Sequence, residues 1–594
     1  MPIIQDYVIP GTTRDSVFGD SIVPTNMHAI DASKKIMAAS TACKTQVPVL
    51  GHNFRPLPRG VENTYINLLS FENLLKGYPN KDHVDYVLHG LRNGFDLGFH
   101  GNVSNQHSKN NKSARDNDKL VTVAIEKEIE RGHTAGPFPA PPFSECQVSP
   151  IGAAPKPDGT VRLVLDLSQP TGESINDFID KEEFPCSYTH FDVATELVYK
   201  TGRGCYLTKI DIKHAYRLLP VRPEDWPLLV YHWKGAYYVD VKLPFGGRSS
   251  ASIFTSFADL VCWILNEKFQ LVVIHYSDDF LMITRADIII AHMQVNKLKK
   301  AFHILNIPVA LDKLIGPSKR LPYLGIEVDT MKFTLHIPQE KVNELLEKMP
   351  RWCGRRTCTL RELQSLNGKL QFFSKVIRPG RMFARRLIDL TKSVNNPNHH
   401  VTMNRGARDD IHWWCELLQK FNSSSFIPDP KRVYSTDLLL FTDAAKHLGF
   451  GAIYGYAWIQ AKWPKKLEEE SIDFQELFAI VAAVYTWGHN WKGKRVVIVT
   501  DNKPITQIWD AGSTPTPTLM SLTRKLYLFA AFHHFSISLK HVLGHYNPVA
   551  DALSRFQMSR FRRLVPDAEP DPTKLPPDVW SLGNHIDRYR VSDD

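Results

Sequence analysis

The sequence lacks the cysteine patterns of a zinc-binding or disulfide-rich protein. Its 594 residues include eight cysteines, and none of these forms a CxxC pair or a Cys/His cluster with zinc spacing. In a chain of this length they are expected to be buried or free thiols of a reducing compartment. A small secreted domain held together by disulfides is therefore excluded.

Long apolar runs are also missing. No stretch of about 18 apolar residues occurs, and the first residues, MPIIQDYVIPGTTRD, lack a charged head followed by an apolar segment. Neither a membrane-spanning helix nor a signal peptide is expected, and no membrane partner. The expected location is intracellular, without a preference between cytoplasm and nucleus.

The composition is that of a globular protein with a basic balance. Hydrophobic residues make up 43% and charged residues 23%, and the net charge is +10. Between Gln339 and Lys392 there are 13 Lys and Arg against 5 Asp and Glu. This concentration of positive charge predicts a surface that contacts phosphates. The length alone predicts about three or four domains.

Hydrophobic spacing predicts mixed α and β structure. Residues 1–60 are expected to be loose, 64–95 helical, Gly101–Asn117 a polar linker, 339–392 helical and Val394–Arg408 a polar separator. After that separator the order strand, strand, helix, strand, helix, helix, strand, helix is expected, with an extended end from Glu569. The predicted strands before position 330 are Leu163–Leu167, Gly204–Ile212, Tyr237–Leu243, Leu271–Tyr276 and Phe280–Ile283, and the predicted helices are Leu120–Gly132, Ser249–Leu265 and Ala286–Leu305.

Three aspartates form the first candidate catalytic group. Asp278 and Asp279 lie at a turn between two apolar β runs in VVIHYSDDFLMI, and Asp211 ends the earlier strand in YLTKIDIKHAY. Adjacent carboxylates repel each other and need compensation when partly buried. Two divalent metal ions bound by acids from neighbouring strands would supply it, and would suit phosphoryl transfer.

Four further acids form a second candidate group. Asp443 ends a strand and is followed by Gly449 and Gly451, and Glu476 lies on a helix whose other face is apolar. Asp501 ends another strand, and Asp551 lies near the start of a helix in GHYNPVADALSR. Four acids in such separate settings again suit a two-metal site.

The YSDD turn with its upstream strand aspartate resembles the palm of a reverse transcriptase. The order Asp, Glu, Asp, Asp and the closing ADALSR resemble the RNase H fold of retroelements. The resemblance implies an α+β multidomain chain: a right-hand polymerase of fingers, palm and thumb, followed by an α/β RNase H-like domain. It also implies two Mg²⁺ or Mn²⁺ ions per site, and RNA template, DNA primer, RNA–DNA hybrid and dNTPs as partners.

The same resemblance implies roles for residues around the palm. In APKPDGTVRLVLDLS it places Lys156 and Arg162 on the phosphates of the incoming nucleotide. Tyr216 matches the aromatic residue that blocks a ribose 2′-hydroxyl, and LPFGGRSSASIF resembles the loop at the new base pair. The implied remaining residues are Phe245 and Gly246 of that loop, Lys313 as proton donor to the pyrophosphate, Tyr323, Leu324 and Gly325 of a primer-contacting hairpin, and His541 as a product-release histidine.

The resemblance covers roughly residues 64 to 585. The runs SFENLLKGYPNKDHVDYVLHGLRNGFDLGF and FRRLVPDAEPDPTKLPPDVW look like DIRS-type retrotransposon polymerases, with a gypsy-type element as the alternative. A separate tyrosine recombinase and a capsid-like protein are then possible partners, since neither a recombinase set nor an aspartic protease motif is found. The implied domains are 1–118 N-terminal extension and polar linker, 119–335 fingers and palm, 336–395 basic helical thumb, 396–434 connection, 435–557 RNase H-like domain and 558–594 extended C-terminal tail.

Two alternatives remain from other functional classes. One is a catalytically silent, nucleic-acid-binding relic of a retroelement, because a fold can outlive its chemistry. The other is a splicing-factor-like or telomerase-like protein built on a polymerase fold. The presence of all seven acids in order favours the enzyme over both.

Overall fold

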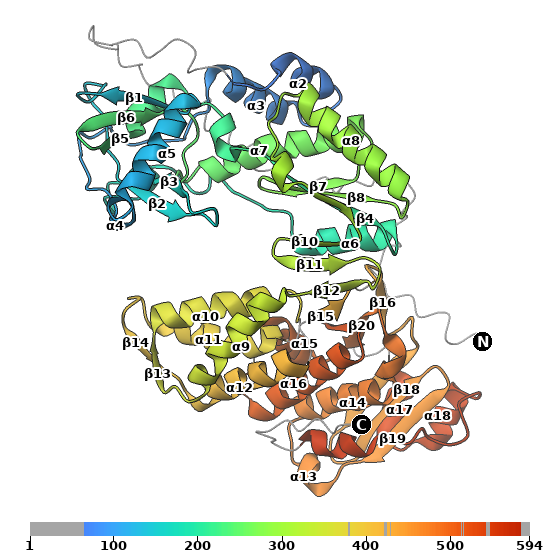
Figure 1. Cartoon of the computed structure of the whole chain (residues 1–594). Helices are drawn as coiled ribbons and strands as arrows, with labels where there is room; N and C mark the ends of the chain where they lie inside the picture. Colours follow the sequence, from blue (N-terminus) through green and yellow to red (C-terminus); the bar gives the residue numbers. More distant parts are fainter. Residues whose placement is uncertain are drawn as a thin grey trace. The chain divides into compact units, whose positions relative to one another are not determined.

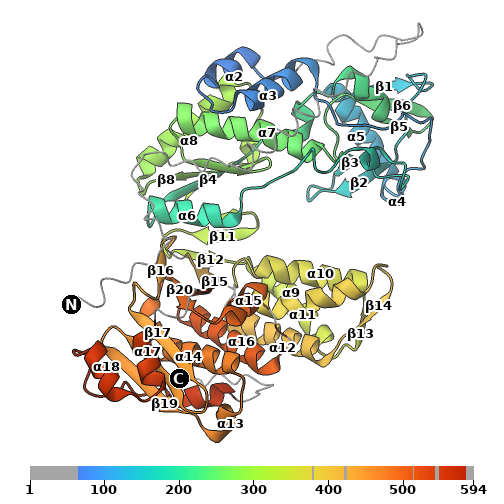
Figure 2. The same cartoon turned by 180° about the vertical axis from the view of Figure 1, so that it is seen from behind.

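The computed structural model describes residues 64–377, 380–420, 424–427, 429–512, 514, 516–541 and 547–583. These residues fall into two compact units (Figures 1 and 2). The N-terminal unit comprises the described part of 19–194 with 205–321, and the C-terminal unit comprises 195–204 with the described part of 322–594. The loose structure expected for residues 1–60 lies outside the described ranges. None of the helices within those ranges has the length and apolar character needed to cross a bilayer.

The N-terminal unit combines helices with short antiparallel strands, as expected. Its helices are α2 (Leu68–Leu74), α3 (Lys81–Asn93), α4 (Lys112–Arg115), α5 (Asp118–Glu130), α7 (Ser250–Trp263) and α8 (Ile288–Ile304), and α6 (Phe191–Thr201) continues into the other unit. Its strands are β1 (Thr134–Phe138), β2 (Ile151–Pro155), β3 (Val161–Leu165), β4 (Tyr206–Asp211), β5 (Val230–Trp233), β6 (Ala236–Asp240), β7 (Val273–Tyr276), β8 (Asp279–Thr284) and β9 (Ile315–Ser318).

The central sheet of this unit has the order β7-β8-β4-β9, with antiparallel neighbours. Helices α7 and α8 pack on it and lie along the same side (Figure 1). The β8 residues from Phe280 to Ile283 are at most 1% exposed, which explains why the strand is a continuous apolar run. Because β4 and β8 are antiparallel, the end of β4 lies beside the start of β8.

The expectation of a linker at Gly101–Asn117 is wrong. The segment contains α4, whose Ala114 is fully buried. The Asn110 side chain accepts a hydrogen bond from Ile151 N at 3.0 Å, and Asn111 N donates to Ile151 O at 3.1 Å. The asparagines therefore bond to the edge of β2 rather than to solvent, and the polar composition reflects these contacts.

The C-terminal unit begins with short strands and helices and ends with a mixed domain. Its first elements are β10 (Arg320–Tyr323, which enters from the other unit), β11 (Ile326–Asp329), β12 (Thr334–His336), α9 (Gln339–Cys353), β13 (Thr357–Thr359), α10 (Leu360–Phe373), α11 (Gly380–Leu390), β14 (His400–Thr402), α12 (Arg405–Lys420) and β15 (Ser424–Phe426). Its later elements are β16 (Arg432–Tyr434), β17 (Leu440–Ala445), β18 (Gly449–Tyr454), β19 (Ala457–Lys462), α13 (Lys465–Glu468), α14 (Ile472–Trp487), β20 (Arg495–Thr500), α15 (Lys503–Ala511), α16 (Pro517–Phe532), β21 (Ser536–His541), α17 (Pro548–Ser554) and α18 (Met558–Leu564).

The basic segment 339–392 is helical, as the sequence predicts. A capping box formed by Thr359 and Glu362 starts α10. Helix α12 packs on α9 and α11, so it belongs to the same helical bundle. The predicted separator Val394–Arg408 is not merely a spacer, because β14 lies in it and pairs with β13.

The later elements form two sheets. Strands β17-β18-β19 are antiparallel, whereas β16-β20-β21 are parallel. Successive β18 side chains point to opposite faces: Ala452 joins a core with α14, and Ile453 joins a core with α17 and α18. Helices therefore cover both faces of the antiparallel sheet. The sequence-based order omitted β19, which is paired along its whole length with β18.

The expectation of an extended C-terminal tail is wrong for the described residues 558–583. Helix α18 buries Phe561, and a 3₁₀ helix at Pro577–Gly583 buries Val579 and Leu582. The Lys525 ammonium donates to Leu582 O at 2.7 Å. This segment is part of the core of the last domain, and the few apolar residues among its prolines and charges anchor it.

Candidate active sites

The first acid cluster is built by two neighbouring strands and one tight turn. Asp211 ends β4 and pairs directly with Asp279, the first residue of β8. Asp278 lies in the turn before β8, and its carbonyl accepts a hydrogen bond from Ile212 N at 3.1 Å. Ser277 has a left-handed φ of 54°, a strained conformation for a residue with a side chain. The structure thus brings the three predicted aspartates together.

The charges of this cluster act on one another. Burial raises the pKa of Asp278 to about 6, and the neighbouring charge of Asp211 adds to the shift. Lys313 Nζ lies 3.3 Å from Asp211 Oδ2, and Lys209 Nζ lies 3.0 Å from Asp279 Oδ1. Sequence reasoning found Lys313 but missed Lys209. The period-2 spacing of Lys209 and Asp211 on β4 was the available signal.

Most of the predicted nucleotide-contacting residues also converge. The Arg162 guanidinium lies 4.8 Å from the centroid of the Phe245 ring, and the Tyr216 ring lies 5.3 Å from that ring. Gly246 has a φ of 116°, and a Cβ there would come within 2.1 Å of Leu165 O, so only glycine fits. Lys156 is exposed at the turn between β2 and β3.

Tyr216 connects this group to the acid cluster. Burial raises the pKa of the Tyr216 phenol, and Ser277 and Asp278 are among the groups that act on it. A residue missed from the sequence, Tyr188, stacks on Tyr276 with ring centroids 4.5 Å apart. The YSDD turn is therefore bordered by tyrosine rings.

The predicted primer hairpin is a true hairpin turn in the C-terminal unit. Leu324 and Gly325 have φ of 48° and 77° and connect β10 to β11. Tyr323 is only 1% exposed, so the half-buried Leu324 and Gly325 form the accessible part of the turn.

The second acid cluster is assembled by four separate elements. Asp443 lies on β17, Glu476 on α14, Asp501 directly after β20 and Asp551 on α17. A Cβ on Gly451, the partner of Asp443 across the sheet, would lie 2.3 Å from Leu553 Cβ. This glycine therefore allows α17 to approach the sheet.

The elements that carry Glu476 and Asp551 pack on β17, which carries Asp443, and the charges of the acids act on one another. Burial raises the pKa of Glu476 to about 9, with the charges of Asp443 and Asp501 adding to it. Burial also raises the pKa of Asp443 to about 6, although the Ser554 hydroxyl opposes the shift. Burial acts to raise the pKa of Asp551 as well, but Arg555, at 2.6 Å, and a second arginine outweigh it and the pKa is lowered.

His541, the candidate product-release residue, lies near the second cluster. It ends β21 and pairs in register with Thr500, the residue before Asp501, and it is exposed. Since β20 and β21 are parallel, His541 and Asp501 lie at the same edge of the sheet.

Comparison with known protein families finds a match for one segment of the chain. The family model described as "Reverse transcriptase (RNA-dependent DNA polymerase)" matches residues 154–328, the segment that contains Asp211, Asp278 and Asp279. Residues 154–328 are a reverse transcriptase domain. The fold expected for the fingers and palm is thereby confirmed, in a chain of mixed helix and sheet.

Curated relatives come from retrotransposons. The Transposon Tf2-3 and Tf2-7 polyproteins of Schizosaccharomyces pombe (strain 972 / ATCC 24843) are each 23% identical to this chain over 497 residues. The alignments cover 79% of this chain and 32% of each polyprotein, so the chain spans about a third of their length.

Solved structures of foamy viral protease-reverse transcriptase are also similar. The form in complex with double-stranded DNA has 14% identity and a TM-score of 0.47, with 84% of both chains covered. The form in complex with RNA/DNA hybrid has 17% identity and a TM-score of 0.41, with 83% of this chain and 65% of that chain covered. Both TM-scores are low, so the reverse transcriptase fold is established by the family model.

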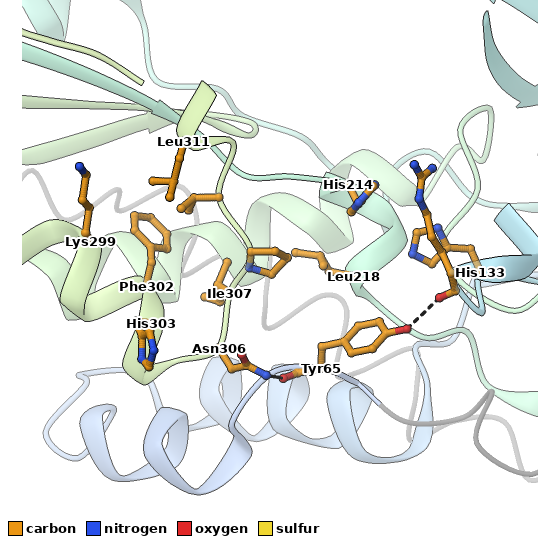
Figure 3. A pocket seen from close by; sticks show the side chains of 13 residues that line it. Tyr65, His133, His214, Leu218, Lys299, Phe302, His303, Asn306, Ile307 and Leu311 are labelled. Carbon is orange, nitrogen blue, oxygen red and sulfur yellow. Dashed lines mark hydrogen bonds between the residues drawn. The ribbon is translucent and has the colours of Figure 1, made fainter. Parts of the chain in front are cut away.

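A cavity of about 580 Å³ lies close to the end of β4 in the reverse transcriptase domain (Figure 3). One of its walls is the segment 306–311, and Ala310 N donates a hydrogen bond to Asp211 O at 2.9 Å. His214 enters the cavity from a left-handed turn with φ of 68°. Burial lowers the pKa of His214 to about 4, so its imidazole is neutral at neutral pH. The cavity therefore shares a wall with the backbone that positions Asp211.

Proposed function

We propose that this chain is an RNA-directed, and also DNA-directed, DNA polymerase that copies a retroelement RNA into DNA. The observation that carries the proposal is the pairing of Asp211 with Asp279, beside Asp278, within a reverse transcriptase domain. Three carboxylates at the edge of one sheet suit divalent metal ions, which would allow a primer end and a nucleoside triphosphate to bind beside them.

The chain's own residues would divide the work as follows. Arg162, with Lys156 on the exposed turn between β2 and β3, would bind the triphosphate. Tyr216 would block a ribose 2′-hydroxyl, and Phe245 would lie at the new base pair. Lys313, next to Asp211, would donate a proton to the departing pyrophosphate. The Tyr323-Leu324-Gly325 hairpin would position the primer strand.

The three aspartates of the first cluster are chemically suited to binding divalent metal ions. Their ligand atoms are carboxylate oxygens, which Mg²⁺ and Mn²⁺ prefer. Burial raises the pKa of Asp278, and the charge of Asp211 adds to the shift, so a cation at this position would be favoured. Within the described residues, no group of three or more such ligands is already gathered around one point. Lysines contact Asp211 and Asp279 instead. Two ions per site would supply Lewis acidity and orient the phosphates.

We further propose that the second acid cluster cleaves the RNA strand of an RNA–DNA hybrid. Support comes from the placement of the four acids on packed elements: Asp443 on β17, Glu476 on α14, Asp501 after β20 and Asp551 on α17. The four acids would position a water molecule against the scissile phosphate, in an RNase H-like domain. His541 at the same sheet edge would assist release of the product.

The type of element and the partners are part of the proposal. A DIRS-like origin, with a separate tyrosine recombinase and a capsid-like protein, rests on the sequence runs at 70–99 and 561–580. An RNA template, DNA primer, hybrid and dNTPs follow from the proposed activities, and an intracellular location follows from those partners.

The test is primer extension on an RNA template with Mg²⁺, with wild-type protein beside Asp279→Asn. DNA synthesis by the wild type alone is the expected result. If neither protein extends a primer with Mg²⁺ or Mn²⁺ on RNA or DNA, the chain is better described as a nucleic-acid-binding relic.

A further inference from the structure

Two cysteines lie side by side in the helical bundle of the C-terminal unit. Cys353 is the last residue of α9 and Cys415 lies within α12, and their Sγ atoms are 3.6 Å apart. Neither is in a disulfide and both are half-buried, so small reagents can reach them. In the sequence they are 62 residues apart, so only the packing of α9 on α12 brings them together.

The distance is longer than a disulfide bond but short enough to close. An S–S bond is about 2.05 Å, so the sulfur atoms must approach by roughly 1.5 Å. Rotation of the side chains together with a small backbone shift can achieve this. Cys353 is followed by Gly354, where the helix ends and a Cβ would meet no atom within 4 Å, so the backbone has room to adjust.

We propose that Cys353 and Cys415 are a modification site, a dithiol that a hydroperoxide converts to a disulfide. One thiolate attacks a peroxide oxygen, which gives a sulfenic acid and releases water or an alcohol. The second thiolate attacks that sulfur, forms the S–S bond and expels the oxygen as water. In sum the two thiols lose two electrons and two protons, and the peroxide O–O bond is reduced. An external thiol reverses the reaction.

The bond would covalently join two helices that pack against each other in the bundle. It would close a loop that contains α10 and α11. Helix α12 also carries Asp410, fully buried, whose carboxylate lies 2.6 Å from Arg524 of α16 in the last domain. Oxidation would therefore tie the basic helix α9 covalently to the helix that docks on the last domain, and would restrict unfolding of the bundle.

The experiment treats the full chain with hydrogen peroxide, blocks remaining thiols with iodoacetamide and maps the peptides by mass spectrometry. A linked peptide pair containing positions 353 and 415, lighter by two hydrogen atoms and separated by dithiothreitol, is expected. Cys353→Ser and Cys415→Ser should each lose the linked pair. Cys186→Ser, at an exposed cysteine, should keep it.

A second measurement is denaturant unfolding of oxidised and reduced protein. The midpoint should rise on oxidation in wild type and in Cys186→Ser, and stay unchanged in the two other serine variants. Full alkylation of both cysteines after peroxide treatment would overturn the proposal. So would pairing of Cys353 with a different cysteine, or an equal midpoint shift in Cys353→Ser. These outcomes do not depend on whether the chain is a polymerase.

Discussion

The two acid clusters handle their negative charge differently. In the N-terminal unit two aspartates each have their own lysine: Lys313 contacts Asp211 and Lys209 contacts Asp279. In the C-terminal unit, two arginines contact the same acid, Asp551, while burial raises the pKa of Glu476 to about 9. In the first cluster the two acids on paired strands each have a lysine beside them, and Asp278 in the turn has a pKa raised by burial to about 6. The second cluster is assembled from four elements, and both of its arginine contacts are made to the acid on one of them, Asp551 on α17.

The largest expected effects separate the two clusters completely. Asp279→Asn should reduce primer extension on the order of 10³-fold, because one preorganised charged group of the site is lost, and should leave hybrid cleavage intact. Glu476→Gln should do the reverse. Both variants are measured in both assays, on the same primed RNA template. A variant that lost both activities would contradict the assignment of one chemistry to each cluster.

Two buried acid–arginine groups outside the clusters should respond to pH in opposite directions. Burial acts to raise the pKa of Glu128, but His133 and Arg217 outweigh it and hold the pKa near 2. Its stabilising effect is present above its ordinary value of 4.5 and is lost as pH falls towards 2. Burial raises the pKa of Asp410 to about 6 despite Arg524. The Asp410 carboxyl binds its proton more tightly in the folded than in the unfolded protein. The free energy of unfolding therefore decreases as pH rises from 3.8 through 6.

Each effect should amount to roughly 3 kcal/mol at most, from a shift of about two pKa units. The measurement is hydrogen exchange in α5 and α12 between about pH 3 and 7. Glu128→Gln should flatten the acid-side loss in α5, and Asp410→Asn should flatten the slope in α12. If the stability of both helices changed with pH in the same direction, the arginine contacts would outweigh burial in both groups.

Lys313 and Lys209 should differ although each contacts one aspartate. If Lys313 donates a proton to pyrophosphate, Lys313→Gln should slow single-nucleotide incorporation by on the order of 10²-fold and shift its pH profile. Lys209→Gln removes only a balancing charge and should have a smaller effect without a pH shift. Rapid-quench incorporation across pH checks this, and equal losses would remove the special role of Lys313.

The acids were predictable because their signals are local. YSDD between two apolar runs and a strand-end Asp211 require only short stretches of chain, and β8 is apolar throughout because helices and neighbouring strands bury it. The signal for Lys209 is equally local, because it lies two residues before Asp211 on β4 and so on the same face of the strand.

The missed features depend on distant partners. The Asn110 side chain accepts a hydrogen bond from the backbone N–H of Ile151, 41 residues away. Its segment therefore has the composition of a linker although it is bonded along the edge of β2. Likewise, Val579 and Leu582 enter a core made by α14 and α16. Hydrophobic periodicity is a local property of the sequence, so it does not predict which distant residues will contact each other.

The smallest effects come from two glycines, one for each cluster. Gly451→Ala places a Cβ 2.3 Å from Leu553 Cβ and 2.9 Å from Ser554 N, so α17 and Asp551 must move. A cost of about 1–3 kcal/mol and reduced hybrid cleavage are expected, with primer extension unchanged. Gly246→Ala, facing Leu165 O, should reduce extension and spare cleavage.

Gly235→Ala is the matched control for Gly246→Ala. It also has a positive φ, of 80°, but its Cβ would meet nothing within 4 Å, so it tests backbone strain without a clash. Thermal unfolding and both activity assays on the three variants check the comparison. If Gly235→Ala reduced primer extension as much as Gly246→Ala, backbone strain would explain why position 246 requires glycine, and the close approach of the loop to β3 would not. If Gly451→Ala left cleavage intact, the position of Asp551 would tolerate movement of α17, and the second cluster would be less tightly constrained by its sheet than the first.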